Sequence, residues 1–432
     1  MATAVPRFGP EIYLAPLTHS GVAYPTVRCL RSWPQSDNSM EDWIVLNVDR
    51  ARIDQLLADS VASKELRGVA AVAADANGSA YAAAYGNRAD TLPFTTDTVI
   101  WMASTTKAMT SVAALQLVEQ GKLTLDEPIY DVLPELENLQ VLEGFDDAGT
   151  PQMRSAVGHV TLRQLLTHTS GFTYSFWDEN THRYQELKAI PGIIECKKAT
   201  LHAPLAFDPG SQWKYGISTD WAGQAVERVT GRRIGDYLHE YLLAPLGMND
   251  SSFVLSEEQR ANLSEMHART PDGVVPIPFE MPQEPEFQMG GGGLYSTPAD
   301  YIRFLRMLLN EGTLDGAQIL RSDTVCEARQ NNIGDLLVTP LPSYDPVITN
   351  DVDLLSTMLK KWSLLGMLNT ERTTSGREPG SLFWAGLSNI YYWVDWSHGS
   401  VGLVATQLLP FADAHVLDLF DQFEAQIHGV DE

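Results

Sequence analysis

Short apolar segments suited to β-strands stand near both ends of the chain, and this arrangement limits the folds available to it. Near the N-terminus, residues 68–74 and 80–86 flank Asn77-Gly78, a dipeptide that favours a tight hairpin turn. Near the C-terminus, the runs 383–387, 390–394 and 401–407 follow one another, and residues 395–399 are typical of a turn between the last two. The sequence therefore predicts one sheet built from both ends of the chain.

Helical patterns fill the middle of the chain and also flank the strands. Residues 49–66, 162–166, 221–230, 234–243 and 413–427 show this pattern. We expect the two terminal helices to cover one face of the sheet and the helix after Ser104 to cover the other. The predicted fold class is α+β, an antiparallel sheet flanked by helices with an inserted, mostly helical domain. Its parts are an N-terminal extension at 1–40, a sheet domain at 41–130 and 291–432, and a helical domain at 131–290.

Composition excludes several kinds of partner. The 432 residues carry a formal net charge of −25, which repels nucleic acid and anionic membranes. No run of about 18 apolar residues is present to span a bilayer. The three cysteines form no CxxC pair and the ten histidines show no ligand spacing, so no metal site is expected. The N-terminus lacks the layout of a secretory signal, which predicts a cytoplasmic protein.

Ser104 and Lys107 form the pair with the clearest chemical meaning. The Ser-x-x-Lys spacing places a hydroxyl and an amine on one helical face, one turn apart. A lysine can take the proton of a serine hydroxyl only if burial or a nearby positive potential lowers its pKa. Ser211 and Lys214 have the same spacing but follow the turn signal Pro209-Gly210. We therefore expect Ser104, ahead of an apolar helix, to be the nucleophile.

Tyr215 is a candidate partner of this pair. A tyrosine phenol has a reference pKa of about 10 and is a poor base. Close to Lys107 it could ionise and accept the Ser104 proton; otherwise its ring simply packs. We assign a structural role to His168, because no Gly-x-Ser-x-Gly elbow exists to pair with it.

Trp384, Gly386 and Leu387 stand on a predicted strand that could border the nucleophile. The backbone N–H groups of Leu387 and Ser104 would then form an oxyanion hole. Gly386 suits close approach of a substrate; the alternative is a central strand with one packed tryptophan. The run Gly290–Gly293 suits a tight wall of the cleft or, equally, a structural turn.

The motifs Ser104-Thr105-Thr106-Lys107, Tyr215, Leu165–Gly171 and Trp384-Ala385-Gly386 together resemble the serine β-lactamase-like superfamily. The chain is most similar to its class C branch and the related family VIII carboxylesterases, over about residues 45 to 430. Residues 142–149, 215–216 and 220–223 also resemble the fungal statin side-chain acyltransferases. The resemblance implies a site in the cleft between a sheet domain and a helical domain. It implies Ser104 as nucleophile, Lys107 and Tyr215 sharing the base role, and Leu387 N–H completing the oxyanion hole, with no cofactor.

Two departures from the lactamase pattern shape the functional expectation. Ile217 stands where lactamases have the Asn of Tyr-x-Asn, and Trp384-Ala385-Gly386 replaces Lys-Thr-Gly. The second change removes a cation that would bind a β-lactam carboxylate and offers the apolar wall of Trp384 instead. The resembling esterases have Trp-Gly-Gly there, so Ala385 is a further small deviation.

We therefore expect a serine carboxylesterase that hydrolyses short- to medium-chain acyl esters of small molecules. An acyltransferase that passes the same acyl group to an alcohol is the first alternative, and a weak β-lactamase the second. A non-enzymatic binding relative is least consistent with the sequence, because it would not need Ser104, Lys107 and Tyr215 together.

Overall fold

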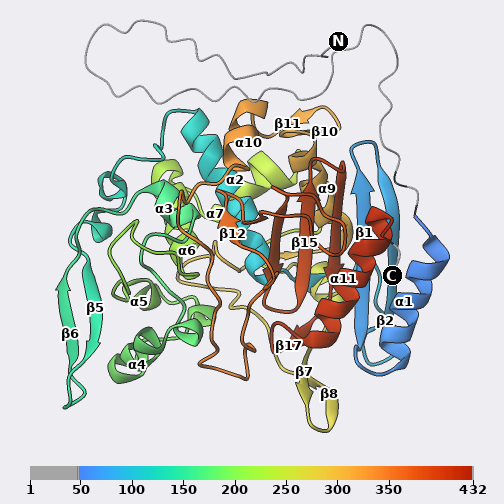
Figure 1. Ribbon diagram of the computed structural model, residues 1–432, viewed down its shortest axis with the longest axis horizontal. Helices are drawn as coiled ribbons and strands as arrows, with labels where there is room; N and C mark the ends of the chain where they lie inside the picture. The colour runs from blue at the N-terminus through green and yellow to red at the C-terminus, as the bar shows by residue number, and fades with distance from the viewer. Residues whose placement is uncertain (1–45, 47, 431–432) are drawn as a thin grey trace, which may run out of the picture. The chain divides into compact units, whose positions relative to one another are not determined.

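The main sheet joins the two ends of the chain, as predicted (Figure 1). The computed structural model describes residue 46 and residues 48–430, so the expected extension at 1–40 lies outside the described residues. Eight strands run in the order β12-β13-β14-β15-β16-β1-β2-β3, and every pairing in this sheet is antiparallel. They are β1 Gly68–Asp75, β2 Ser79–Ala89, β3 Leu92–Pro93, β12 Lys360–Trp362, β13 Met367–Asn369, β14 Leu382–Gly386, β15 Ile390–Asp395 and β16 Ser400–Ala405. The predicted α+β fold with an antiparallel sheet is confirmed.

Two aspartates close the hairpins of this sheet. Asp75 Oδ1 accepts the backbone N–H groups of Asn77 at 2.7 Å and Gly78 at 2.9 Å. Asp395 Oδ1 likewise accepts from the N–H groups of Ser397 and His398. An aspartate side chain that binds the backbone two or three residues on mimics a turn, which explains why both turns could be predicted from sequence.

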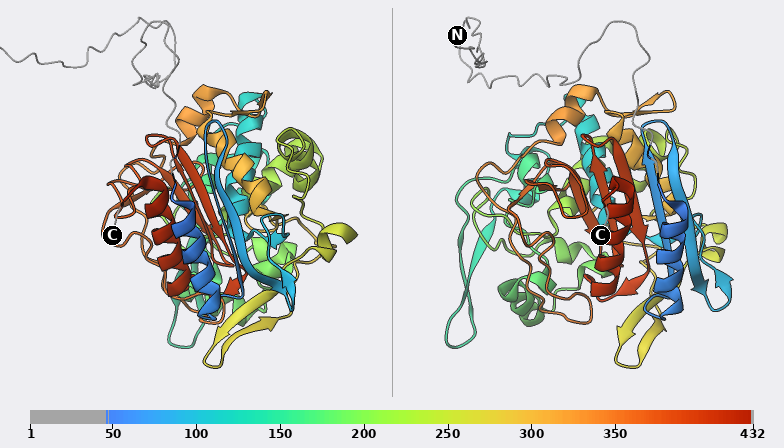
Figure 2. Two further views of the ribbon diagram at one scale, coloured as in Figure 1. Left: turned by 90° about the vertical axis from the view of Figure 1, so that its right-hand side faces the viewer. Right: turned by 45° about the vertical axis from the view of Figure 1, so that its right-hand side comes forward.

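Helices cover both faces of the sheet. Helices α1 (Arg50–Ala62) and α11 (Ala414–His428) pack against each other and on one face. Helix α9 (Pro298–Leu309) packs on β1, β15 and β16, and Figure 2 shows it on the opposite face. The terminal helices therefore lie as predicted.

The prediction for the helix after Ser104 was wrong. Helix α2 (Thr106–Glu119) packs against α6 (Ser218–Thr230) and α7 (Ile234–Leu238), and α9 covers the second sheet face instead. The physical reason is that α2 is buried on all sides from Thr106 to Leu117. A helix without a polar face cannot serve as an outer layer.

The chain between the strands is helical but not entirely so. Its other helices are α3 Leu162–Leu166, α4 Glu179–Lys188, α5 Lys198–Leu201, a π-helical turn at His239–Leu243, α8 Glu257–Ala261 and α10 Ser322–Ala328. It also contains two hairpins, β5 Gln140–Phe145 with β6 Pro151–Ser155, and β7 Met266–Thr270 with β8 Gly273–Ile277. Short pairs complete it: β4 Ile100–Trp101 with β9 Tyr295–Ser296, β10 Thr313–Leu314 with β11 Ala317–Gln318, and β17 Leu408–Leu409 parallel to β7. The division into a sheet domain and a helical domain at 131–290 stays a prediction.

Within the described residues, no helix combines the length and apolarity required to cross a bilayer.

Candidate active site

Ser104 stands on a tightly held turn between β4 and α2. The preceding residue, Ala103, has a φ of 46°, a left-handed conformation that strains a residue with a Cβ. Gln407 binds both backbone groups of Trp101, accepting from its N–H at 3.0 Å and donating to its carbonyl at 3.1 Å. The Trp101 indole N–H donates to Gly292 O at 2.7 Å. These bonds hold the start of the turn in place.

Lys107 Nζ lies 3.1 Å from Ser104 Oγ, as the spacing predicted. The amine also donates to Tyr174 Oη at 2.9 Å and to Gly291 O at 2.6 Å. Burial lowers the pKa of Lys107 to about 7, and the charge of Asp220 opposes that change. A neutral amine has two N–H groups and one lone pair. With the two N–H groups bound to Tyr174 and Gly291, the lone pair is left for the Ser104 proton.

Tyr215 lies in the same site but is not ionised. Lys107 Nζ stands 4.7 Å from the centre of the Tyr215 ring, and the Trp384 indole N–H donates to Tyr215 Oη at 2.9 Å. Burial raises the pKa of Tyr215 above its usual value, and hydrogen bonds with Ser104 and Trp384 only partly oppose this. The phenol is therefore neutral, which leaves Lys107 as the better base of the two.

Trp384 and Gly386 occupy the predicted strand β14 but make contacts that differ from the expected ones. Trp384 is buried against Tyr215 and Trp362, with ring centres 4.8 and 4.6 Å away, so it supports Tyr215 instead of forming an apolar wall. A Cβ on Gly386 would lie 2.6 Å from Met102 O. The close approach that requires glycine is thus made by the nucleophile turn.

Leu387, the residue directly after β14, lines the same pocket as Ser104. Aromatic and aliphatic side chains dominate its wall. The lining residues are Trp101, Ala103, Ser104, Tyr174, Phe176, Trp177, Ile193, Ile194, Met289, Gly292 and Leu387. Among the described residues, those that line this pocket carry no charged side chain, so the pocket suits an uncharged, apolar group.

Two residues of the site escaped the sequence analysis in their present roles. The hydroxyl of Tyr174 is a partner of Lys107, and no spacing in the sequence connects these two residues. Asp220 is fully buried and accepts the N–H of Gly291 at 2.8 Å. Asp220 stands five residues after Tyr215 and is far in sequence from the glycine run 290–293, so no local pattern showed that these segments meet.

The Ser211–Lys214 pair and His168, which the sequence analysis set aside as catalytic candidates, make structural contacts. Lys214 pairs with Asp178, whose other oxygen caps α4 at the Thr181 N–H, and Ser211 Oγ donates to Asp208 O. His168 Nδ1 accepts from Gly216 N at 3.3 Å, and its ring packs on Tyr215. His168 therefore supports the segment that carries Tyr215, in agreement with the structural role assigned to it.

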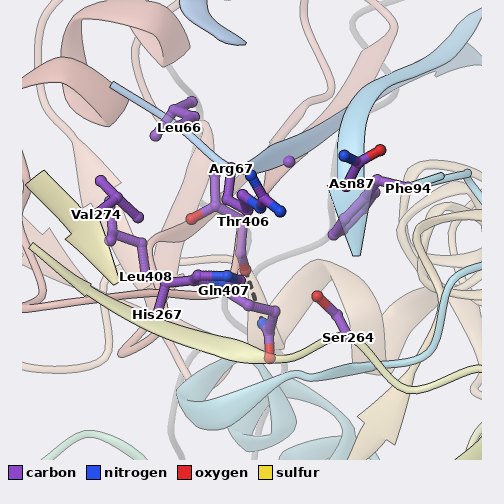
Figure 3. Close-up of a pocket in the computed structure, with 11 residues that line it drawn as sticks. Leu66, Arg67, Asn87, Phe94, Ser264, His267, Val274, Thr406, Gln407 and Leu408 are labelled. Carbon is purple, nitrogen blue, oxygen red and sulfur yellow. Dashed lines mark hydrogen bonds between the residues drawn. The ribbon is translucent and has the colours of Figure 1, made fainter. Parts of the chain in front are cut away.

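A second pocket includes Gln407, the residue that binds the backbone of Trp101. Its lining includes Arg67, just before β1, His267 of β7 and Gln407 (Figure 3). Burial lowers the pKa of His267. Ser104 does not line this pocket, so we centre the candidate site on the first. In the part of the chain that the structure describes, no group of three or more His, Cys, Asp and Glu residues is placed to hold a metal ion.

Comparison with known proteins agrees with this architecture. The Beta-lactamase family model matches residues 53–426. Monacolin J acid methylbutanoyltransferase of Aspergillus terreus is 32% identical over 86% of this chain and 93% of its own. Lovastatin esterase of Penicillium rubens is 31% identical over 87% of this chain and 98% of its own. The unliganded simvastatin synthase of Aspergillus terreus superposes with a TM-score of 0.75 at 29% identity, covering 88% of this chain and 98% of that one.

The chain therefore belongs to the β-lactamase family. The matched relatives include proteins named as acyltransferases and as an esterase, which makes acyl transfer the chemistry to consider for this site.

Proposed function

We propose that this protein is a serine carboxylesterase that hydrolyses short- to medium-chain acyl esters through an acyl-enzyme on Ser104. The observation that carries the proposal is the 3.1 Å contact between Ser104 Oγ and the buried amine of Lys107 at an apolar pocket. A serine hydroxyl needs an adjacent base to act as a nucleophile, and a lysine with a lowered pKa is such a base.

In the first half-reaction, neutral Lys107 accepts the proton of Ser104 as Oγ attacks the ester carbonyl. The backbone N–H groups of Ser104 and Leu387 are the proposed donors to the oxyanion, and each such donor typically contributes about 10²–10³ in rate. The C–O bond to the alcohol then breaks. The departing alkoxide takes a proton passed from Lys107 through the neutral phenol of Tyr215, so that an alcohol leaves and Lys107 is neutral again.

In the second half-reaction, water attacks the acyl-enzyme and gives its proton to the same relay. Ser104 recovers its proton as the acid leaves. Lys107 and Tyr215 thus serve as base and then as acid in each half, and no group outside the chain is needed to balance the protons.

The lining of the pocket favours binding of uncharged acyl groups. Tyr174, Phe176 and Trp177 form its aromatic side, and Ile193, Ile194 and Met289 add aliphatic contacts. A carboxylate on the acyl group would lose its hydration there without gaining a cation. The same reasoning, with Trp384 in place of a lysine, makes β-lactam turnover slow.

An acyltransferase is the second candidate, because several relatives of similar identity carry acyltransferase names. Its first half-reaction is the same, and an alcohol replaces water in the second. The balance between the two depends on whether an acceptor bound at the acyl-enzyme competes with water.

Hydrolysis of p-nitrophenyl esters from acetyl to dodecanoyl, with wild type and Ser104→Ala, tests the proposal. We expect the wild type to hydrolyse the shorter esters and Ser104→Ala to lose this activity. The p-nitrophenyl ester of methylbutanoic acid, supplied with and without monacolin J acid as acceptor, then separates the candidates, since a transferase diverts the acyl group to the acceptor. A folded wild type that cleaves no ester, with or without acceptor, would refute both.

A further inference from the structure

Asp220 is a buried carboxylate that the proposed mechanism does not use. It stands in the first turn of α6 and has no exposed surface. Its Oδ1 accepts the N–H of Gly291 at 2.8 Å. Within the described residues, its Oδ2 has no hydrogen-bond partner. A buried carboxylate with one oxygen unpaired is costly to the fold, so its presence calls for a function.

Gly291 connects Asp220 to the catalytic amine. Its N–H binds Asp220, and its carbonyl accepts from Lys107 Nζ at 2.6 Å. A Cβ on Gly291 would lie 2.6 Å from Asp220 Oδ2, so only glycine fits between the carboxylate and the loop. One helical turn after Asp220, a Cβ on Gly223 would lie 3.4 Å from the Gly290 Cα. Helix α6 therefore packs closely on the glycine run that contacts Lys107.

Among the described residues, few charged groups surround the Gly291 peptide. Burial raises the pKa of Asp220 to about 6, and the charge of Lys107 opposes that change. The pKa of Lys107 is about 7, so Asp220 carries its charge where the amine loses its proton, and burial of both groups makes their attraction strong. The other titratable groups that face Asp220 are Tyr174, Tyr215 and Cys196. His168 faces Lys107. Burial keeps all four of these groups neutral, so the carboxylate of Asp220 is the charge that favours the protonated amine.

We propose that Asp220 is a positioning residue for acyl transfer, an inference that rests on the proposed function. Through the Gly291 peptide it holds Lys107 at Ser104, and its charge sets the pH at which the amine becomes a base. The first role needs a hydrogen-bond acceptor at position 220; the second needs a negative charge.

Asp220→Asn separates the two roles, because asparagine keeps an acceptor for Gly291 and removes the charge. We measure the rate at which a fluorophosphonate probe labels Ser104 from pH 5 to 10, a readout that needs no substrate. Loss of an opposite charge nearby shifts a pKa by about one to three units. The rising limb of the labelling profile should therefore move to lower pH by at least about one unit in this variant.

Asp300→Asn is the matched control. Asp300 stands in the first turn of α9, is buried, and accepts from Asp250 N and Ser251 Oγ, both at 2.9 Å. Loss of its charge should leave the labelling profile in place, because its partners lie outside the site. Asp220→Ser, which is smaller and also uncharged, repeats the test if the amide does not fit.

The outcomes are distinct. A labelling profile of folded Asp220→Asn or Asp220→Ser that coincides with the wild type would overturn the inference. Loss of the fold in both variants would also overturn it, because Asp220 would then serve the whole structure. Wild type that is labelled at Ser104 but cleaves no ester would remove the proposed function, and the labelling profiles would still decide the role of Asp220.

Discussion

Replacement of Gly386 by alanine tests how the nucleophile is held in position. The new Cβ would lie 2.6 Å from Met102 O and 3.3 Å from Thr105 Cγ2, whereas ordinary contact begins near 3.4 Å. Strand β14 and the nucleophile turn must therefore separate by about 0.8 Å, since a packed interior has no free space to absorb the clash. Met102 O also accepts from Thr105 Oγ1 at 2.8 Å, so the turn that carries Ser104 moves as a unit.

The cost to activity follows from this displacement. A misplacement of about 1 Å reduces the rate about 10²-fold, so a shift of this size predicts a loss of about 30- to 100-fold in kcat/KM. That loss corresponds to about 2–3 kcal/mol of transition-state stabilisation. Overpacking of a core costs about 1–3 kcal/mol of stability, which leaves most of the protein folded at room temperature.

The assay compares p-nitrophenyl butyrate hydrolysis and thermal unfolding of Gly386→Ala with those of Gly78→Ala. A Cβ at Gly78 meets nothing within 4 Å, so this control carries the same substitution without the clash and should keep wild-type kcat/KM. If folded Gly386→Ala hydrolyses the ester within about threefold of wild type, the reasoning that β14 fixes the nucleophile turn is refuted.

Three further predictions concern single interactions. Trp384→Phe removes the 2.9 Å bond to Tyr215 Oη, and we expect about a fivefold lower kcat, since one hydrogen bond contributes about 1 kcal/mol; steady-state kinetics below the melting temperature of the variant checks this. Because burial lowers the pKa of Lys107 to about 7, kcat/KM should rise with pH through this region as the amine loses its proton, and a flat profile from pH 5 to 9 would contradict Lys107 as base. Burial lowers the pKa of His428 from 6.5 to about 3, so its contribution to stability is complete above pH 6.5 and is lost as the pH falls. Between pH 7 and 5 this loss is about 2 kcal/mol, and urea unfolding at both values should find it absent in His428→Gln.

The parts of the fold that sequence could predict are those with local causes. The hairpin at Asn77-Gly78 and the turn at residues 395–399 depend on neighbouring residues, and so does the Ser104–Lys107 pair, one helical turn apart. The amphipathic terminal helices are also readable from their own residues. The position of helix α2 was predicted wrongly because an apolar pattern on all sides, unlike a one-sided pattern, does not show which neighbours surround the helix.

The residues of the candidate site were named from sequence, and they stay a prediction; their contacts could be foreseen only in part. Gly291 and Lys107 are 184 positions apart in sequence, and no local pattern shows that the glycine run reaches the amine. The indole N–H of Trp384 donates to the hydroxyl of Tyr215, a residue 169 positions away in sequence. The sequence indicated only the apolar character of the Trp384 ring. The protonation of Tyr215 depends on burial, which exists only once the chain has folded.

The contacts of Lys107 support the proposal that a lysine serves here as the base. Its two bonds to Tyr174 Oη and Gly291 O aim the third position of the amine at Ser104. Before proton transfer that position holds the lone pair, and afterwards it holds an N–H that faces the same oxygen. Neither partner has to move, so transfer proceeds with little reorganisation of the surroundings. The buried charge of Asp220 then offsets the cost of forming an ammonium away from water, and burial keeps that ammonium acidic enough to return its proton. The proposed base depends on the balance of these two effects, so we expect Asp220 to influence acyl transfer through Lys107 although it does not touch the substrate.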